Sequence, residues 1–256
     1  MLSSELKAAL PTTSELPCSD DIPVDNEDQN LLPNILLFLL QSIWQERMDW
    51  YFGVDMAIYH TTGVSPQVPV VPDAFLSLDV ERKKDGKSRR SYATWEENDR
   101  LPLFVLEMVS QTPGGEYDRK LELYQNLGVL YYLVYNPEYW RRDRQQPFEI
   151  YKLVEGSYQL QIGEPYWLKE IGLGIGRVRG VFNGIEQEQL AWFDRNGLRY
   201  LTDGERVNLE LERAEMEADR ADSEAKRANL EAKRAEKLAE YLRSIGVDPN
   251  NLPELR

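Results

Sequence analysis

Two short apolar segments, separated by one amphipathic segment, constrain the fold of this chain more than any other feature. Residues 103–109 and 130–135 are almost continuously apolar, which is typical of strands covered on both faces. Between them, residues 112–115 read as a turn, and residues 116–127 have the apolar spacing of a helix that ends at Gly128. A strand, a helix and a strand joined this closely predict a right-handed parallel crossover within one sheet.

The segments on either side of this unit predict further elements. We expect a helix at residues 31–50, strands at 54–59 and 68–78, and a hairpin of strands at 148–154 and 158–162. Short strands punctuated by glycine follow as far as residue 200. The Gly-Leu-Gly-Ile-Gly sequence at residues 172–176 completes no dinucleotide-binding fingerprint, so we interpret these glycines as turn residues.

The composition excludes several kinds of chemistry. The 256 residues include one cysteine, Cys18, and one histidine, His60, so an internal disulfide, a cysteine cluster and a two-histidine zinc site are excluded. The longest apolar stretch, near residues 35–40, is far shorter than the roughly 20 residues of a membrane span, and the N-terminus does not resemble a signal peptide. We therefore expect a cytoplasmic protein with no membrane partner, whose polar chemistry rests on Asp, Glu, Lys, Arg and Tyr.

Three acidic residues interrupt segments that are otherwise apolar, namely Asp55, Asp73 and Glu107. Burying an ionised carboxylate is unfavourable unless a cation or strong hydrogen bonds compensate it. Any one of the three can be a structural acid, but three in consecutive predicted strands favour a shared cause. A hard divalent cation, Mg²⁺ or Mn²⁺, fits this pattern because Mg²⁺ takes few protein oxygens and keeps its waters.

The predicted helix at residues 116–127 carries a second unusual feature. Lys120 falls in the middle of its apolar half, where a lysine either extends to solvent or points its ammonium at an anionic group. The helix directly follows the strand that carries Glu107, which favours the second alternative. A divalent cation, two carboxylates and an ammonium group are the parts of a phosphodiester hydrolase. The acids Asp55, Asp73 and Glu107 and the ammonium of Lys120 are therefore the candidates for such a site.

The net charge of −14 argues against a nucleic-acid partner, but the distribution of charge weakens that argument. Most of the acidic excess lies in the flanks, at residues 1–30 and 201–256. Residues 82–90 hold six basic side chains in nine positions, which are either a solvated loop or contacts to phosphate groups. The candidate nucleic-acid contacts are Arg82, Lys83, Lys84, Lys87, Arg89 and Arg90.

The C-terminal segment has a heptad pattern made almost entirely of alanine. From Leu211 to Leu242, small or apolar residues recur at alternating spacings of three and four, with charged residues around them. A face of alanine buries little area within one chain, so we predict pairing, most simply as a homodimer, with a free-standing charged helix as the alternative. The predicted organisation is a mobile acidic arm (1–30), a central domain (31–200), a coiled-coil-like helix (201–246) and a tail (247–256).

Several motifs in the central domain resemble those of a known family. They are Val71-Pro72-Asp73, residues 106–110, residues 116–124 with the following Leu127-Gly128-Val129, and residues 131–137. Together they resemble the Uma-type (Uma two) restriction endonuclease family, a bacterial branch of the PD-(D/E)XK nuclease superfamily. The resemblance implies an α/β or α+β restriction-endonuclease-like core of helix, mixed sheet and helix, here with added hairpins and the long C-terminal helix. It also implies Mg²⁺-dependent hydrolysis of DNA, with Asp73 and Glu107 binding the metal.

The resemblance assigns further roles and exposes two departures. In the superfamily the catalytic lysine stands two residues after the glutamate, where this chain has Val109, and in this branch the next helix supplies it, which matches Lys120. Asp55 and Glu46 match auxiliary acids. The branch usually carries an aspartate where this chain has Leu103. The alternatives to an endonuclease are an inactive nuclease fold that binds DNA or drives assembly through its C-terminal helix, and an acidic scaffold that never meets nucleic acid.

Overall fold

A six-stranded mixed sheet organises the first of two units into which the chain divides, Met1–Tyr200 and Leu201–Arg256. The structure, a computed structural model, describes residues 9–18, 26–62, 68–112, 114–182 and 184–250. The strand order in this sheet is β1-β3-β5-β6-β7-β8. The strands are β1 (Trp50–Val54), β3 (Ala74–Leu78), β5 (Phe104–Met108), β6 (Tyr131–Tyr135), β7 (Phe148–Val154) and β8 (Ser157–Leu160).

The predicted parallel pairing of the two apolar strands, with a helix between them, is confirmed. Strands β5 and β6 pair in parallel, and helix α3 (Arg119–Leu127) connects them. Gly128 ends this helix in the left-handed conformation, with φ of 87°, and its backbone N–H closes the last turn. The other pairs in this sheet are antiparallel, which includes the predicted hairpin of β7 and β8.

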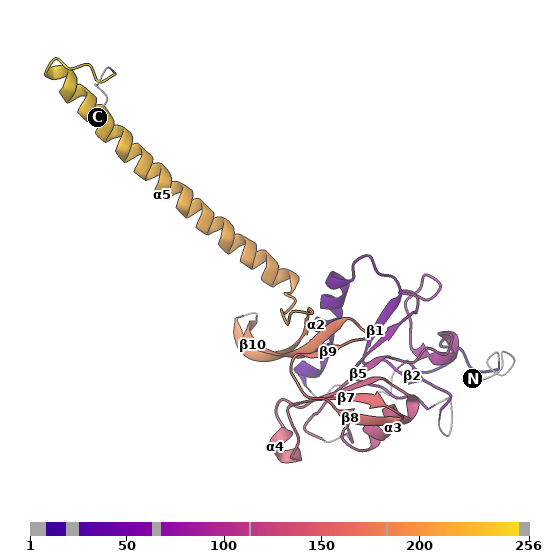
Figure 1. The fold of residues 1–256 in the computed structure, drawn as a ribbon. Helices are drawn as coiled ribbons and strands as arrows, with labels where there is room; N and C mark the ends of the chain where they lie inside the picture. Colours follow the sequence, from indigo (N-terminus) through magenta and orange to yellow (C-terminus); the bar gives the residue numbers. More distant parts are fainter. Residues whose placement is uncertain (1–8, 19–25, 63–67, 113, 183, 251–256) are drawn as a thin grey trace. The chain divides into compact units, whose positions relative to one another are not determined.

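Alternation along β5 directs its side chains to two separate hydrophobic clusters. Phe104, Leu106 and Met108 pack in the cluster that contains the buried leucines of α2 (Glu27–Ile43). Val105 packs on the other face, with residues of α3. The core is therefore a helix, a mixed sheet and a second helix, as the family resemblance implied (Figure 1).

Smaller elements complete the first unit. A three-stranded sheet covers the same face as α2, and the indole N–H of Trp192 in β11 (Ile185–Phe193) donates to the carbonyl of Leu36, 3.0 Å away. These remaining elements are β2 (Ile58–Tyr59), β4 (Tyr92–Ala93), η1 (Thr94–Glu96), α4 (Trp140–Asp143), β9 (Tyr166–Leu168), β10 (Leu173–Phe182) and β11 (Ile185–Phe193).

The predicted bounds of two elements, the first helix and the strand at 54–59, were wrong. Helix α2 begins earlier than predicted because Asn26 caps it by accepting the backbone N–H of Gln29, and it ends seven residues before the predicted limit at residue 50. Residues 50–54 instead form β1, whose aromatic side chains suit a strand. The predicted strand at 54–59 is broken by a bend, where Asp55 has a φ of 46°.

The segment predicted to be a mobile arm packs on the domain over its described part. The phenol of Tyr59 donates to the carbonyl of Pro17 at 2.8 Å, and the indole of Trp95 donates to that of Pro11 at 3.0 Å. Leu16 is only 6% exposed. Residues 9–18 are thus held by specific contacts, and residues 26–30 form the cap and the first turn of α2. The rest of the predicted arm lies outside the described residues.

The second unit is dominated by helix α5 (Asp203–Ser244). Thr202 and Glu205 form a capping box at its start, in which each side chain accepts the other residue's backbone N–H. None of its residues is buried, so its alanine face is open to solvent. Within the described part of the chain, no helix is both long and apolar enough to cross a membrane.

Candidate active site

Asp73 and Glu107 meet across two neighbouring strands. Asp73 directly precedes β3, and Glu107 is the fourth residue of β5. The antiparallel register pairs Ala74 with Leu106, so continuing it by one residue sets Asp73 opposite Glu107. One carboxylate oxygen of Asp73 accepts the backbone N–H of Met108 at 2.6 Å, which anchors its side chain to β5.

Lys120 points at Glu107, as the amphipathic pattern of the helix predicted. Its Nζ lies 2.7 Å from Oε2 of Glu107, and its side chain is 23% exposed whereas that of Glu107 is 1% exposed. A second buried carboxylate, that of Glu116, lies 3.9 Å from the same ammonium. The lysine is therefore held by buried acids and reaches solvent only in part.

The sequence did not predict that Tyr124 and Glu116 belong to this site. The phenol of Tyr124 donates to Oε1 of Glu107 at 2.6 Å, and the backbone N–H of Gly114 donates to the carboxylate of Glu116 at 3.0 Å. In the sequence, Tyr124 lies on the apolar half of the predicted helix, a position that is typical of packing. A signal was present, because Glu116 and Tyr124 stand four residues before and after Lys120, on the same face of the segment.

The electrostatics of the site follow from burial and mutual repulsion. Burial raises the pKa of Asp73 well above its ordinary value of 3.8, and the charge of Glu107 raises it further. Burial also raises the pKa of Glu107, although Lys120 and Tyr124 oppose this. Burial alone lowers the pKa of Lys120, but its contact with Glu107 prevails and the net shift is upward. The lysine is thus an ammonium beside two carboxylates that repel each other.

The two auxiliary acids lie in different places. The backbone N–H of Asp55 donates to the carbonyl of Asp73 at 3.1 Å, and the charge of Asp55 contributes to the raised pKa of Asp73. Asp55 therefore lies at the site, although it is exposed at a bend rather than within a strand. Glu46 is exposed in the turn after α2, whose buried residues pack on the opposite face of the sheet from Glu107. The structure does not bring Glu46 to the other candidates.

The basic segment at residues 82–90 is engaged largely within the protein. The side chain of Arg89 is 2% exposed and pairs with Glu97 at 2.8 Å, while its guanidinium lies over the ring of Tyr51. The guanidinium of Arg82 lies over Trp50, and the ammonium of Lys84 donates to a backbone carbonyl. The members of the basic segment that are exposed are Lys83, Lys87 and Arg90.

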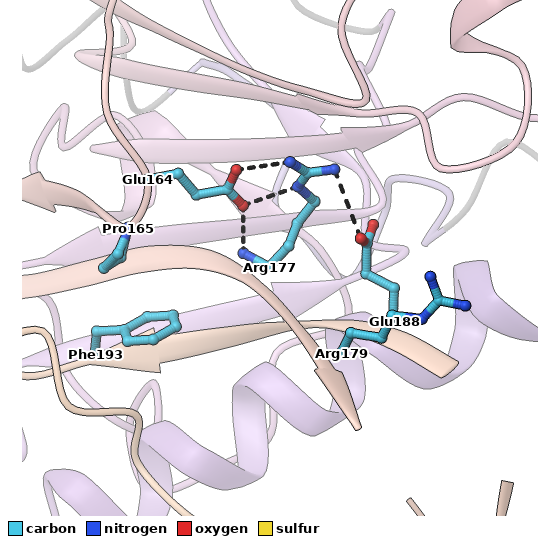
Figure 2. A pocket seen from close by; sticks show the side chains of 6 residues that line it. All are labelled: Glu164, Pro165, Arg177, Arg179, Glu188 and Phe193. Carbon is cyan, nitrogen blue, oxygen red and sulfur yellow. Dashed lines mark hydrogen bonds and ion pairs between the residues drawn. The ribbon is translucent and has the colours of Figure 1, made fainter. Parts of the chain in front are cut away.

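A pocket of about 330 Å³ lies elsewhere, against the three-stranded sheet. At its centre Arg177 pairs with Glu164 at 2.8 Å and reaches Glu188 at 3.6 Å (Figure 2). Its charged groups are thus largely paired with one another, and it includes none of the candidate catalytic residues. The pocket is lined by Glu164, Pro165, Arg177, Arg179, Glu188 and Phe193.

The donor set of the site suits a small divalent cation. In the described residues, no group of three or more His, Cys, Asp or Glu side chains is arranged to hold a metal ion. Mg²⁺ does not require such a cage, because one or two carboxylates with several waters are its usual protein environment. Asp73 and Glu107 supply two hard oxygen donors whose mutual repulsion a cation would relieve, so the residues fit such an ion.

Comparison with known proteins gives the class of this chain. A family described as "Putative restriction endonuclease" matches residues 22–174, which include Asp55, Asp73, Glu107 and Lys120. This is the Uma2 family, and the chain belongs to it. The family description supports a nuclease function.

One solved structure is distantly similar to the chain. A solved structure described as a putative nuclease belonging to DUF820, from Anabaena variabilis, is 11% identical with a TM-score of 0.41. The alignment covers 62% of this chain and 88% of that one. No curated protein matches the chain.

Proposed function

We propose that this protein is a Mg²⁺- or Mn²⁺-dependent endonuclease that hydrolyses phosphodiester bonds of DNA. The observation that carries the proposal is the opposition of Asp73 and Glu107 across two strands, with the ammonium of Lys120 on Glu107. These side chains come from three separate segments of a chain that belongs to a family described as restriction endonucleases. A structural role alone does not require a second acid beside a buried ion pair, because that acid destabilises the charged state.

Asp73 and Glu107 would hold the divalent cation in this proposal. A bound Mg²⁺ lowers the pKa of a water molecule and neutralises charge on the scissile phosphate. Lys120 keeps its ammonium beside these carboxylates, where it can donate a hydrogen bond to the attacking water or to a phosphate oxygen. Glu116 lies 3.9 Å from the same ammonium, and the exposed Asp55 is an auxiliary acid next to Asp73.

The exposed basic residues support a nucleic-acid substrate. Lys83, Lys87 and Arg90 are exposed on the basic segment and are candidates for phosphate contacts. Arg82, Lys84 and Arg89 lie on the same segment, but their contacts within the protein favour a structural role. Substituting the exposed group should weaken DNA binding and reduce its salt dependence, whereas the fold should be unaffected.

We also propose that helix α5 mediates self-association through its alanine face, as a homodimer in the simplest case. The support is the unbroken heptad spacing from Leu211 to Leu242, together with the finding that no residue of α5 is buried in one chain. Pairing with a second copy would bury this face, which a single chain leaves in water.

Two separate measurements, of DNA cleavage and of cation binding, test the proposal. Purified full-length protein with Mg²⁺ or Mn²⁺ should cleave double- or single-stranded DNA, and EDTA should abolish the cleavage. Lys120→Met should remove cleavage but retain cation binding, whereas Asp73→Ala should lose both. The control is Lys152→Met, which removes another partly exposed lysine that is paired with a glutamate away from the site.

The outcomes distinguish an active endonuclease from the alternative of an inactive nuclease fold. Intact DNA under all conditions, with cation binding unaffected by Asp73→Ala, would contradict the hydrolytic proposal. Binding of DNA that survives Lys120→Met, without cleavage, would instead favour an inactive nuclease fold that binds DNA or drives assembly. This alternative draws support from Leu103, which stands where the family that the chain resembles usually has an aspartate.

A further inference from the structure

Both oxygens of Glu107 already have hydrogen-bond donors from helix α3. Oε1 accepts the phenol O–H of Tyr124 at 2.6 Å, and Oε2 accepts the ammonium of Lys120 at 2.7 Å. Glu107 and Tyr124 are buried, whereas Lys120 is partly exposed. A metal site that includes Glu107 therefore requires the Lys120 ammonium to leave Oε2, or to remain there beside a second positive charge, which is unfavourable.

An ammonium that leaves Glu107 needs another carboxylate, because an unpaired charge in a largely buried place is costly. Asp73 does not serve, since it is the other proposed metal ligand. The carboxylate of Glu116 is buried, and its Oε1 lies 3.9 Å from Nζ of Lys120. This distance is too long for a hydrogen bond, but the flexible side chain of a lysine can close it.

Glu116 is held in place by contacts that do not involve Glu107. Both of its carboxylate oxygens accept the backbone N–H of Gly114, each at 3.0 Å. Its backbone carbonyl accepts the phenol O–H of Tyr132 at 2.8 Å. A Cβ at position 114 would overlap the Glu116 carboxylate, so glycine allows this close approach of amide and carboxylate. Glu116 is therefore a preformed acceptor beside Lys120.

We propose that Glu116 is a positioning residue that receives the ammonium of Lys120 when Glu107 binds a divalent cation. This inference rests on the proposed metal site. Glu116 stands four residues before Lys120, the spacing at which two side chains meet on one helical face, so the lysine side chain alone can make this move. Glu116 acts through Lys120, which thereby keeps a counter-charge and stays close to the two metal ligands.

A double-mutant cycle on cation affinity tests the inference. The full-length wild type, Glu116→Gln, Lys120→Met and the double variant are each titrated with MgCl₂ in a calorimeter. Removing a negative charge near a metal site weakens Mg²⁺ binding by itself and does so in both backgrounds, so the informative quantity is the coupling between the two substitutions. The loss of affinity caused by Glu116→Gln should be about tenfold larger with Lys120 present than in Lys120→Met, a size usual for coupled residues of one ion-pair network.

Glu149→Gln is the matched control for burial and loss of charge. Glu149 is as buried as Glu116, and its carboxylate likewise accepts a backbone N–H, that of Gln146 at 2.7 Å. Its other hydrogen bond is to the phenol of Tyr151 rather than to Lys120. Any effect of Glu149→Gln on Mg²⁺ affinity should therefore be the same in the wild-type and Lys120→Met backgrounds.

A second measurement needs only the wild-type protein. In crystals grown with MnCl₂, Nζ of Lys120 should lie within hydrogen-bond distance of the Glu116 carboxylate, about 3 Å, and no longer on Oε2 of Glu107. Equal losses of affinity in the two backgrounds, or an ammonium that stays on Glu107 while manganese is bound there, would overturn the inference and leave the metal site intact. Failure of the wild-type protein to bind any divalent cation would instead overturn the proposed function, and with it the inference.

Discussion

Asp73 places a second carboxylate beside the ion pair of Glu107 and Lys120, in which the two charges already compensate each other. Glu107 and Lys120 form a buried ion pair, and each Glu107 oxygen has a hydrogen-bond donor. Asp73 adds a negative charge whose pKa is raised first by burial and then by Glu107. Such an arrangement destabilises the protein without a cation, which is typical of residues retained for function rather than for folding.

Asp73→Asn should therefore stabilise the protein in the absence of metal. The amide oxygen can still accept the backbone N–H of Met108, while the repulsion with Glu107 is removed. We expect an increase of about 1 kcal/mol in the free energy of unfolding at neutral pH, measured by urea denaturation in EDTA. Added Mg²⁺ should stabilise the wild type and not the variant.

The same variant has a predicted pH dependence. A carboxyl whose pKa is raised in the folded state binds its proton more tightly there, so its contribution to stability is present below the ordinary value of 3.8 and is lost as pH rises through the raised value. The difference in unfolding free energy between Asp73→Asn and wild type, in EDTA, should therefore grow as pH increases above about 4. A difference that is flat or shrinks with pH would contradict this assignment.

Arg89 provides a prediction that separates structural from DNA-binding basic residues. Its ion pair with Glu97 is almost fully buried, so Arg89→Ala leaves an uncompensated buried charge. The variant should lose about 3 kcal/mol of unfolding free energy, whereas Lys87→Ala should change it by less than about 0.5 kcal/mol because Lys87 is exposed. Equal effects of the two substitutions on stability would refute the structural role.

Helix α3 shows how much of the site the sequence contains. Lys120 was predicted to point at an anion because it is a charged residue at the centre of an apolar face, and it does contact Glu107. Tyr124 escaped prediction, since a tyrosine on an apolar helical face is equally typical of packing. Only the structure shows that its hydroxyl reaches a carboxylate 17 residues earlier in the chain.

The strands show where a local sequence pattern misleads. The glycines of residues 172–176 were interpreted as turn residues, but Gly174 and Gly176 lie within β10. A Cβ at position 176 would lie 2.9 Å from the Cα of Pro165, so this glycine serves a close approach of two backbones. Such an approach is a tertiary contact, and local turn preferences do not contain it.

Helix α5 carries acidic residues along both edges of its alanine face. In a parallel pair these edges would bring like charges together, with Glu210 opposite the partner's Glu215, Glu217 opposite Asp222 and Glu231 opposite Glu236. Pairing is then opposed by repulsion that salt screens.

Self-association of the full-length protein should therefore strengthen with ionic strength. Sedimentation equilibrium between roughly 0.05 M and roughly 0.5 M NaCl should show a falling dissociation constant. The double variant Glu217→Lys/Glu231→Lys should associate at low salt, whereas Glu212→Lys, a charge change away from the alanine face, should have a smaller effect. A monomer under all conditions would support the alternative of a free-standing helix.

At the scale of the whole molecule, the order of the elements along the chain was more predictable than which strands lie side by side in the sheet. The crossover β5–α3–β6 and the β7–β8 hairpin follow from local patterns, because consecutive elements pair over short connections. The pairing of β3 with β5 brings Asp73 to Glu107 across a long connection that includes the basic segment and β4. No local pattern gives that register, so the resemblance to the family carried the expectation that the two acids meet.

The most direct test of the account is a crystal structure of the protein grown with MnCl₂, using the anomalous scattering of manganese. The account predicts a manganese peak bound by carboxylate oxygens of both Asp73 and Glu107, which is absent in Asp73→Asn crystals grown in the same way. Manganese found only elsewhere, with Lys120 still paired to Glu107 and Asp73 unchanged, would contradict a hydrolytic metal site at this position.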